Sequence, residues 1–248
     1  MIMPDKRYTM DFTISSFDVD ARGMASLQSI SRYMQEIATM HAKELKLGFH
    51  DMMKENRAWV LAQMLIRIDR FPPIHESFSI TSWSNGPDGR FALRDFEITD
   101  KDNNIIGAAS STWFVVDVST KRICRLDNYF EGYQYDNKVQ VMGRNPARIK
   151  PFEESETEHD FEVRYSDLDI NGHLNNVRYI DFILDMFTDQ FRMDHEINEL
   201  EMNFLKESRS GDQLSGRMMQ GKGENEYLHT LLNTTAGRPS FTARTKWI

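Results

Sequence analysis

The sequence predicts an α+β protein built from two similar units, each an antiparallel sheet wrapped around a long helix. The first observation is an order of strand, turn, helix and four strands that occurs twice along the chain. The second is self-similarity, because laying Asp18 on Asp167 brings residues 18–24 onto residues 167–173. The third is periodicity: apolar residues alternate in the expected strands and recur every three or four residues in the expected helices. Together they indicate duplication of one structural unit.

The first unit is expected to begin with a strand at 7–16, where residue character alternates. Ser26 is suited to cap a helix that continues to about residue 46, and Gly48 ends that helix. Positions 27, 30, 34, 37 and 41 of this helix have three-four spacing. From residue 57 the period changes to two, which predicts strands at 58–70, 76–84, 90–99 and 104–118.

The second unit repeats this order after a connector. We expect a first domain at 1–126, a linker at 127–156 and a second domain at 157–248. The linker contains Pro146 and Pro151 and balances basic against acidic residues, as solvated segments do. A helix is expected from Asn175 or Asn176 to about residue 192. The expected strands lie at 159–165, 196–208, 212–221, 225–234 and 239–248.

The composition is that of a soluble globular protein. The 248 residues are 40% apolar and 27% charged, and the formal net charge of −8 argues against a general nucleic-acid binder. A single cysteine, Cys124, excludes an intramolecular disulfide and fits a reducing compartment. The chain shows neither the apolar core of a signal peptide nor an apolar run of the ~20 residues needed to span a bilayer. We therefore expect a cytoplasmic protein with no membrane partner.

Polar side chains gather in the second copy of the turn. Asp169, Asn171 and His173 are two residues apart, so an extended segment points all three to one side. Gly172 between them permits a turn with positive φ. The helix that follows offers unpaired N–H groups and a positive dipole end, which suit a developing oxyanion.

Other interpretations of this turn need to be weighed. Its Asp-x-Asp-x-Asn-Gly pattern opens like a calcium-binding loop, but the twelfth position is Arg178 instead of Glu. Zinc ligands do not follow at suitable spacing. A plain capped turn is the remaining alternative. Against it, the first copy keeps the two Asp positions and the Gly but has Arg22 and Met24 where the second has Asn171 and His173. A turn alone would not distinguish the copies.

The arrangement resembles the acyl-acyl carrier protein (acyl-ACP) thioesterases of the plant and bacterial fatty-acid pathway, which have a double hotdog fold. The resemblance covers about residues 5 to 248. Its most specific motif is Ser-Asp-Leu-Asp-Ile-Asn-Gly-His-Leu-Asn-Asn-Val-Arg-Tyr-Ile at 166–180. The other segments that carry the resemblance lie at 33–41, 59–64, 68–72, 81–83 and 94–96.

The resemblance implies a thioester hydrolase with Asp169, Asn171, His173 and Glu207 as catalytic residues and no cofactor or metal. Plant members have Cys after the Glu, whereas this chain has Ser208, so a Cys–His nucleophile is excluded and Ser208 would need strong activation. We favour Glu207 as a general base on water, made a stronger base by burial.

The resemblance also implies an acyl-chain tunnel in the first unit and an acidic carrier protein as partner. Met34, Ile37, Ala38 and Met64 are candidates for the tunnel, with core packing as the alternative. Candidates for contacts with the carrier protein are the cations Arg144, Arg148, Lys150 and Arg178. A coenzyme A thioesterase, a 3-hydroxyacyl thioester dehydratase and a non-catalytic acyl-thioester-binding protein remain alternatives, and self-association as a homodimer is left open.

Overall fold

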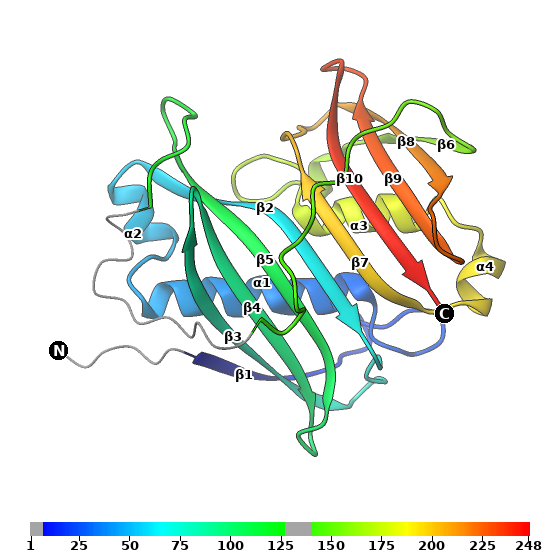
Figure 1. Ribbon diagram of the computed structural model, residues 1–248, viewed down its shortest axis with the longest axis horizontal. Helices are drawn as coiled ribbons and strands as arrows, with labels where there is room; N and C mark the ends of the chain where they lie inside the picture. Colours follow the sequence, from blue (N-terminus) through cyan, green and yellow to red (C-terminus); the bar gives the residue numbers. More distant parts are fainter. Residues whose placement is uncertain (1–6, 127–139) are drawn as a thin grey trace. The chain divides into compact units, whose positions relative to one another are not determined.

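The computed structural model describes residues 7–126 and 140–248. The chain divides into two compact units, Met1–Pro146 and Ala147–Ile248. Each unit has an antiparallel sheet with a helix across one of its faces (Figure 1). The predicted linker at 127–156 lies partly outside the described residues. Its described part, 140–156, contains neither helix nor strand.

The first unit has five strands in the order β1-β3-β4-β5-β2, with the long helix α1 lying against them (Figure 1). Ser26 caps α1, because its hydroxyl accepts a hydrogen bond from the N–H of Ser29 at 3.2 Å. One face of the helix, including Ile30, Met34 and Ile37, is fully buried. The elements are β1 (Arg7–Thr13), α1 (Leu27–Glu44), α2 (Phe49–Lys54), β2 (Arg57–Ile68), β3 (Ser77–Asp88), β4 (Phe91–Asp100) and β5 (Ile105–Asp117).

The second unit has five strands in the order β7-β10-β9-β8-β6, with the helix α3 across one face (Figure 1). Tyr179 of α3 stacks on Phe241 at 4.9 Å and meets Phe204 edge to face at 5.8 Å, which fixes the helix on the sheet. The elements are β6 (Thr157–Glu162), the 3-10 turn η1 (Tyr165–Asp167), α3 (Asn176–Leu184), α4 (Asp189–Asp194), β7 (Ile197–Phe204), β8 (Gln213–Gln220), β9 (Glu226–Asn233) and β10 (Arg238–Trp247).

The strand predictions are confirmed within a few residues, but the second helix is not a single long one. α3 ends at Leu184, and Thr188 caps a separate short helix, α4, by accepting the N–H of Phe191 at 3.2 Å. Phe187 lies between the two helices and packs on Trp247 at 4.8 Å. The apolar period continued through residue 191 because the partly exposed Phe191 of α4 also packs on the sheet, at 5.2 Å from Trp247, and periodicity does not detect a break between the helices. The sequence analysis also missed α2.

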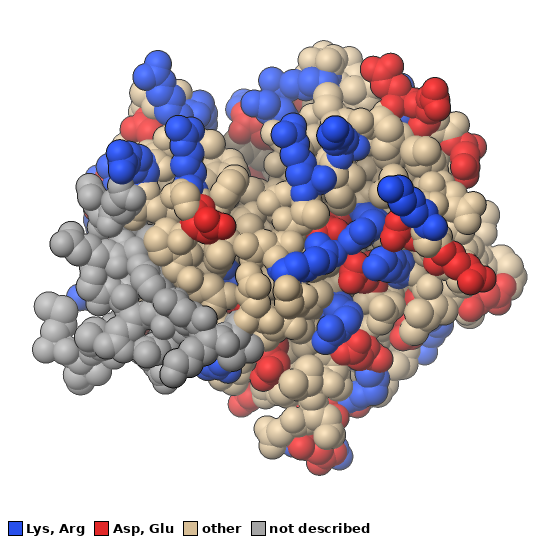
Figure 2. Space-filling model, in the orientation of Figure 1, with Lys and Arg blue, Asp and Glu red and all other residues tan. Residues whose placement is uncertain are grey.

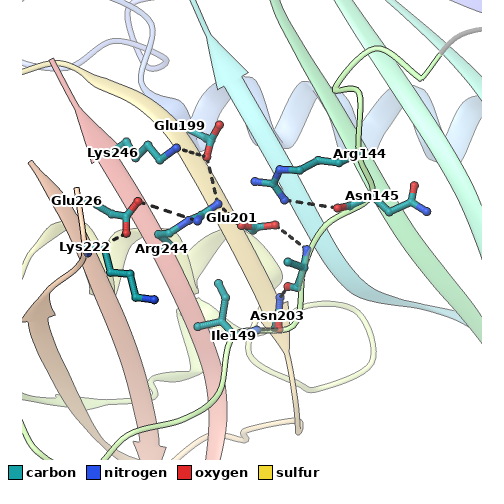
Figure 3. A network of polar contacts seen from close by, with 11 residues as sticks. Arg144, Asn145, Ile149, Glu199, Glu201, Asn203, Lys222, Glu226, Arg244 and Lys246 are labelled. Carbon is teal, nitrogen blue, oxygen red and sulfur yellow. Dashed lines mark hydrogen bonds and ion pairs between the residues drawn. The ribbon is translucent and has the colours of Figure 1, made fainter. Parts of the chain in front are cut away.

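The face of the second sheet that points away from α3 holds the end of the connector. Because strand residues alternate, Asn203 and Thr242 point to the face opposite Phe204 and Phe241. Asn203 accepts the N–H of Ile149 at 2.8 Å (Figure 3), and Thr242 donates to the carbonyl of Ile149 at 3.1 Å. Residues 147–152 are therefore bound along the sheet as a strap, where the sequence predicted a solvated linker.

A buried carboxylate completes this attachment. Glu201, 1% exposed, accepts the N–H of Ala147 at 2.6 Å and pairs with Arg244 (Figure 3). Arg244 also reaches Glu199 at 3.3 Å, and Lys246 pairs with Glu199 at 3.3 Å. Acidic and basic side chains are consequently interspersed on this face of the second unit (Figure 2).

Candidate active site

The turn before α3 is organised by the carboxylate of Asp169. One oxygen of that carboxylate accepts the N–H of Asn171 at 2.8 Å and the N–H of His173 at 3.1 Å. The main chain closes the turn, because the N–H of Asp169 donates to the carbonyl of His173 at 2.7 Å. Gly172 has φ +73°, which a residue with a Cβ rarely adopts. The turn therefore fixes the backbone from which the His173 side chain projects.

The first unit contains the same turn with other side chains. Asp20 accepts the N–H of Arg22 at 2.9 Å and that of Met24 at 3.2 Å, and Gly23 has φ +75°. The predicted repeat is thus confirmed at the level of individual hydrogen bonds. Because Asp20 does this without Asn or His beside it, the shared carboxylate maintains the turn, and only the second unit adds Asn171 and His173.

The two Asp residues that make this turn resemble a calcium loop have roles within the turn itself. The carboxylate of Asp167 accepts the N–H of Arg164 at 2.9 Å, so both Asp167 and Asp169 are used on the chain's own N–H groups. Among the described residues, no group of three or more His, Cys, Asp and Glu residues is placed to hold a metal ion.

At the start of α3, the main-chain N–H of Asn176 differs from those of its neighbours. Asn175 caps the helix, and its side-chain oxygen accepts the N–H of Val177 at 3.0 Å. The N–H of Leu174 donates to the carbonyl of Ser208 at 2.8 Å, and the N–H of Arg178 donates to that of Asn175 at 2.9 Å. Between them, the N–H of Asn176 has no acceptor in the described part of the chain. It is therefore the candidate donor for an oxyanion at this helix end.

Glu207 reaches this turn from the loop after β7. Its Oε2 lies 3.1 Å from Nε2 of His173, so residues far apart in the sequence meet as the resemblance implied. Asn171 does not make this contact, and its side-chain amide bonds to Asp169 at 3.4 Å. The expected burial of Glu207 is wrong, because its side chain is 40% exposed. The loop that carries it ends the strand and leaves the carboxylate at the surface.

Ser208 is fully buried. The hydroxyl of Tyr179 donates to Ser208 Oγ at 3.4 Å, and the side-chain amide of Asn233 donates to the same atom at 3.3 Å. Burial raises the pKa of Tyr179, so its hydroxyl remains a donor at neutral pH. Ser208 therefore anchors the loop in the core, and these contacts argue against its use as a nucleophile.

Arg209 is a residue of this site that the sequence analysis missed. Its guanidinium donates to Glu207 Oε1 at 3.0 Å and lies 3.3 Å from Nε2 of His173. The main-chain N–H of Arg209 donates to Asp212 at 2.8 Å, and Asp212 also accepts from Asn233 at 2.7 Å. The only signal in the sequence was the spacing of two from Glu207, which puts both side chains on one side of an extended loop.

The equivalent loop of the first unit has lost every polar side chain of this group. The N–H of Ala25 donates to the carbonyl of Pro72 at 2.8 Å, as the N–H of Leu174 does to that of Ser208. This pairing places Phe71 at the position of Glu207 and Pro73 at the position of Arg209. The first unit therefore keeps the scaffold of the site without its charges.

Comparisons with known proteins agree with this geometry. Residues 5–133 match the family model for the acyl-ACP thioesterase N-terminal domain, and residues 149–248 match the model for the C-terminal domain. The chain belongs to the acyl-ACP thioesterase family. As in other acyl-ACP thioesterases, the two units form a double hotdog fold.

Solved structures and curated relatives give the extent of the likeness. A crystal structure of an acyl-ACP thioesterase from Bacteroides thetaiotaomicron superposes with a TM-score of 0.89 and 28% identity, covering 98% of each chain. The 12:0-ACP thioesterase from Umbellularia californica has the same fold, with a TM-score of 0.86, 19% identity and coverage of 98% of each chain. The chloroplastic palmitoyl-acyl carrier protein thioesterase of Gossypium hirsutum is 25% identical over 213 residues, which are 81% of this chain and 52% of that protein. The chain spans about half to two thirds of the length of the first curated relatives.

The four residues predicted for the acyl tunnel lie inside the first unit. Met34, Ile37 and Ala38 share the buried face of α1, and Met64 is buried on β2. Their exposed fractions are 0, 0, 6 and 2%, which fits either core packing or a tunnel wall. Their role in substrate binding stays a prediction.

None of the helices in the described part of the chain is long and apolar enough to cross a bilayer.

Proposed function

We propose that the chain hydrolyses the thioester of fatty acyl-ACP and releases a free fatty acid. The observation that carries this proposal is the contact of His173 Nε2 with Glu207 Oε2 at 3.1 Å beside a helix start, in a chain of the acyl-ACP thioesterase family. A carboxylate and an imidazole at this distance can share an attacking water, and an N–H group at a helix start can receive the negative charge that follows.

The proposed reaction begins with a water bound beside the contact of Glu207 with His173. Glu207 takes a proton as the water oxygen attacks the thioester carbonyl, which gives a tetrahedral oxyanion. The N–H of Asn176 donates to that oxyanion, a contribution typically worth ~3 kcal/mol per donor. Collapse of the intermediate breaks the C–S bond, and the proton held by Glu207 goes to the departing thiolate. Asp169 keeps the turn closed by accepting two main-chain N–H groups, and Asn171 donates one of them.

Thiol release from acyl-ACP substrates of several chain lengths tests the proposal. We expect release by the unmodified protein and a loss of at least ~10²-fold in kcat for Glu207→Gln and for His173→Ala, because each removes a proton-transfer or water-binding group. Glu158→Gln is a matched control, since Glu158 is an exposed carboxylate of the same unit that pairs with Arg217 at 3.7 Å. Full activity of Glu207→Gln would contradict the general-base role. Conversion of 3-hydroxyacyl substrates without thiol release would instead indicate a dehydratase, and binding without turnover a non-catalytic protein.

The acyl chain is proposed to lie in the first unit, against Met34, Ile37, Ala38 and Met64. The supporting observation is that all four side chains are apolar and buried, three of them on α1 and one on β2. If they line the tunnel, Ile37→Trp shortens it, and thiol release should shift toward shorter acyl chains. Release rates across chain lengths measure this shift. An unchanged preference in a folded variant would assign the residue to core packing.

A further inference from the structure

The cation of Arg209 lies between the two side chains on which the proposed hydrolysis depends. Its Nη2 donates to Glu207 Oε1 at 3.0 Å and has hydrogen-bond geometry toward His173 Nε2 at 3.3 Å. One Nη2 atom carries two hydrogens, so both bonds can exist together. The side chain of Arg209 is 62% exposed, while its main chain is held by Asp212. The guanidinium is thus presented to the site from a fixed backbone.

The ring nitrogen of His173 lies between two groups with opposite hydrogen-bonding character. A guanidinium only donates hydrogen bonds, whereas an ionised carboxylate only accepts them. Nε2 is 3.1 Å from Glu207 Oε2 and 3.3 Å from Arg209 Nη2, so it can donate to the carboxylate when it carries a proton and accept from the guanidinium when it does not. The bond between Arg209 and Glu207 Oε1 does not depend on this choice.

We propose that Arg209 is a positioning residue that holds the Glu207 carboxylate in its orientation beside His173. This inference rests on the proposed function, because it assigns Arg209 a part in the same hydrolysis. The guanidinium donates to Oε1 of Glu207, and Oε2 of the same carboxylate lies 3.1 Å from Nε2 of His173. With Arg209 in place, the group proposed to take the proton from water is fixed at both oxygens.

Other charged and titratable groups around the contact are the same in every variant considered. Asp169 faces it from the turn, Tyr179 from α3, and Lys206 and Asp212 belong to the loop that carries Glu207. The first unit supports the assignment independently, since it has Pro73 at the position of Arg209 where Met24 and Phe71 occupy the positions of His173 and Glu207. The cation occurs only in the copy with the two groups that it contacts.

The kinetic constants of thiol release are the first test, with Arg209→Met as the variant. Removing the guanidinium should lower kcat about tenfold or more, because Glu207 loses its orientation, while KM changes little. Arg209→Lys keeps the charge with one donor group and should restore part of kcat.

Arg192→Met is the matched control, because Arg192 is also a surface arginine of the second unit paired with a carboxylate, Asp185, at 3.3 Å. It should leave kcat unchanged. If Arg209→Met has the kcat of the unmodified protein, the proposal is overturned. Absence of thiol release by the unmodified protein would instead overturn the proposed function.

Discussion

At the scale of the residue, single side chains have different tasks in the core and at the site. His229 is fully buried; its Nε2 lies 3.0 Å from the Thr245 hydroxyl, and its ring meets Phe187 edge to face at 5.6 Å. Burial lowers the pKa of His229 from 6.5 to about 3, because a cation in this apolar setting loses its hydration. His173, by contrast, is partly exposed and lies beside charged groups. The two histidines therefore differ in environment, because His229 lies in the core and His173 lies beside charged groups at the site.

His229 should make the protein sensitive to acid. The contribution of neutral His229 to the free energy of unfolding is fully present above pH 6.5. This contribution is lost as the pH falls from about 6.5 towards about 3, at up to roughly 1.4 kcal/mol per pH unit. Urea unfolding at a series of pH values measures this slope. His229→Gln should be less stable at pH 7 but show a flatter dependence below pH 6.5. Equal slopes in the two proteins would show that His229 is not responsible.

At the scale of the element, the turn before each helix is one structure used twice. Asp20 and Asp169 make the same pair of bonds to main-chain N–H groups, and Gly23 and Gly172 have the same positive φ. The helices that follow differ in length, since α1 has 18 residues and α3 has nine. The turn geometry is therefore independent of the helix length and of the polar side chains added in the second unit.

This duplication predicts different effects of two equivalent mutations. Asp20→Ala and Asp169→Ala each remove one acceptor of two N–H groups and should each lower the free energy of unfolding by about 1 to 3 kcal/mol. Only Asp169→Ala should also lower kcat, because only that turn positions His173. Unfolding curves and thiol-release rates of the two variants measure this. A comparable loss of kcat in a folded Asp20→Ala protein would argue against the division of tasks between the units.

At the scale of the whole molecule, the predicted carrier-protein contacts do not share one face of the second unit. Arg148 and Lys150 belong to the strap, which lies on the sheet face opposite α3, whereas Arg178 is on α3 and pairs with Asp181 at 2.8 Å. Arg178 also lies 3.5 Å from Asp167, close to the turn of His173. Arg144 belongs to the first unit. A carrier protein that delivers its thioester to Glu207 is therefore proposed to contact Arg178.

Charge-reversal variants test which of these two surfaces of the second unit contacts the carrier protein. Arg178→Glu should raise KM for acyl-ACP several-fold, because an acidic carrier protein then meets a negative charge beside the site. The double variant Arg148→Glu, Lys150→Glu should leave KM unchanged, since those residues lie on the other face. Melting temperatures of both variants control for loss of the Arg178 ion pairs. An unchanged KM for a folded Arg178→Glu protein would remove Arg178 from the docking surface. The cytoplasmic location stays a prediction from the single Cys124 and the composition.

The sequence by itself determined the features that depend on local pattern. Period-two and three-four spacing located the strands and the first helix, and the Asp-x-x-Gly turns revealed the repeat, because these signals come from neighbours in the chain. The family resemblance supplied Glu207 as the partner of His173. Only the tertiary structure decided that Ser208 is buried, that Arg209 contacts His173 and Glu207, and that residues 147–152 are bound by Asn203 and Thr242. These contacts join segments far apart in the sequence, and no periodicity records them.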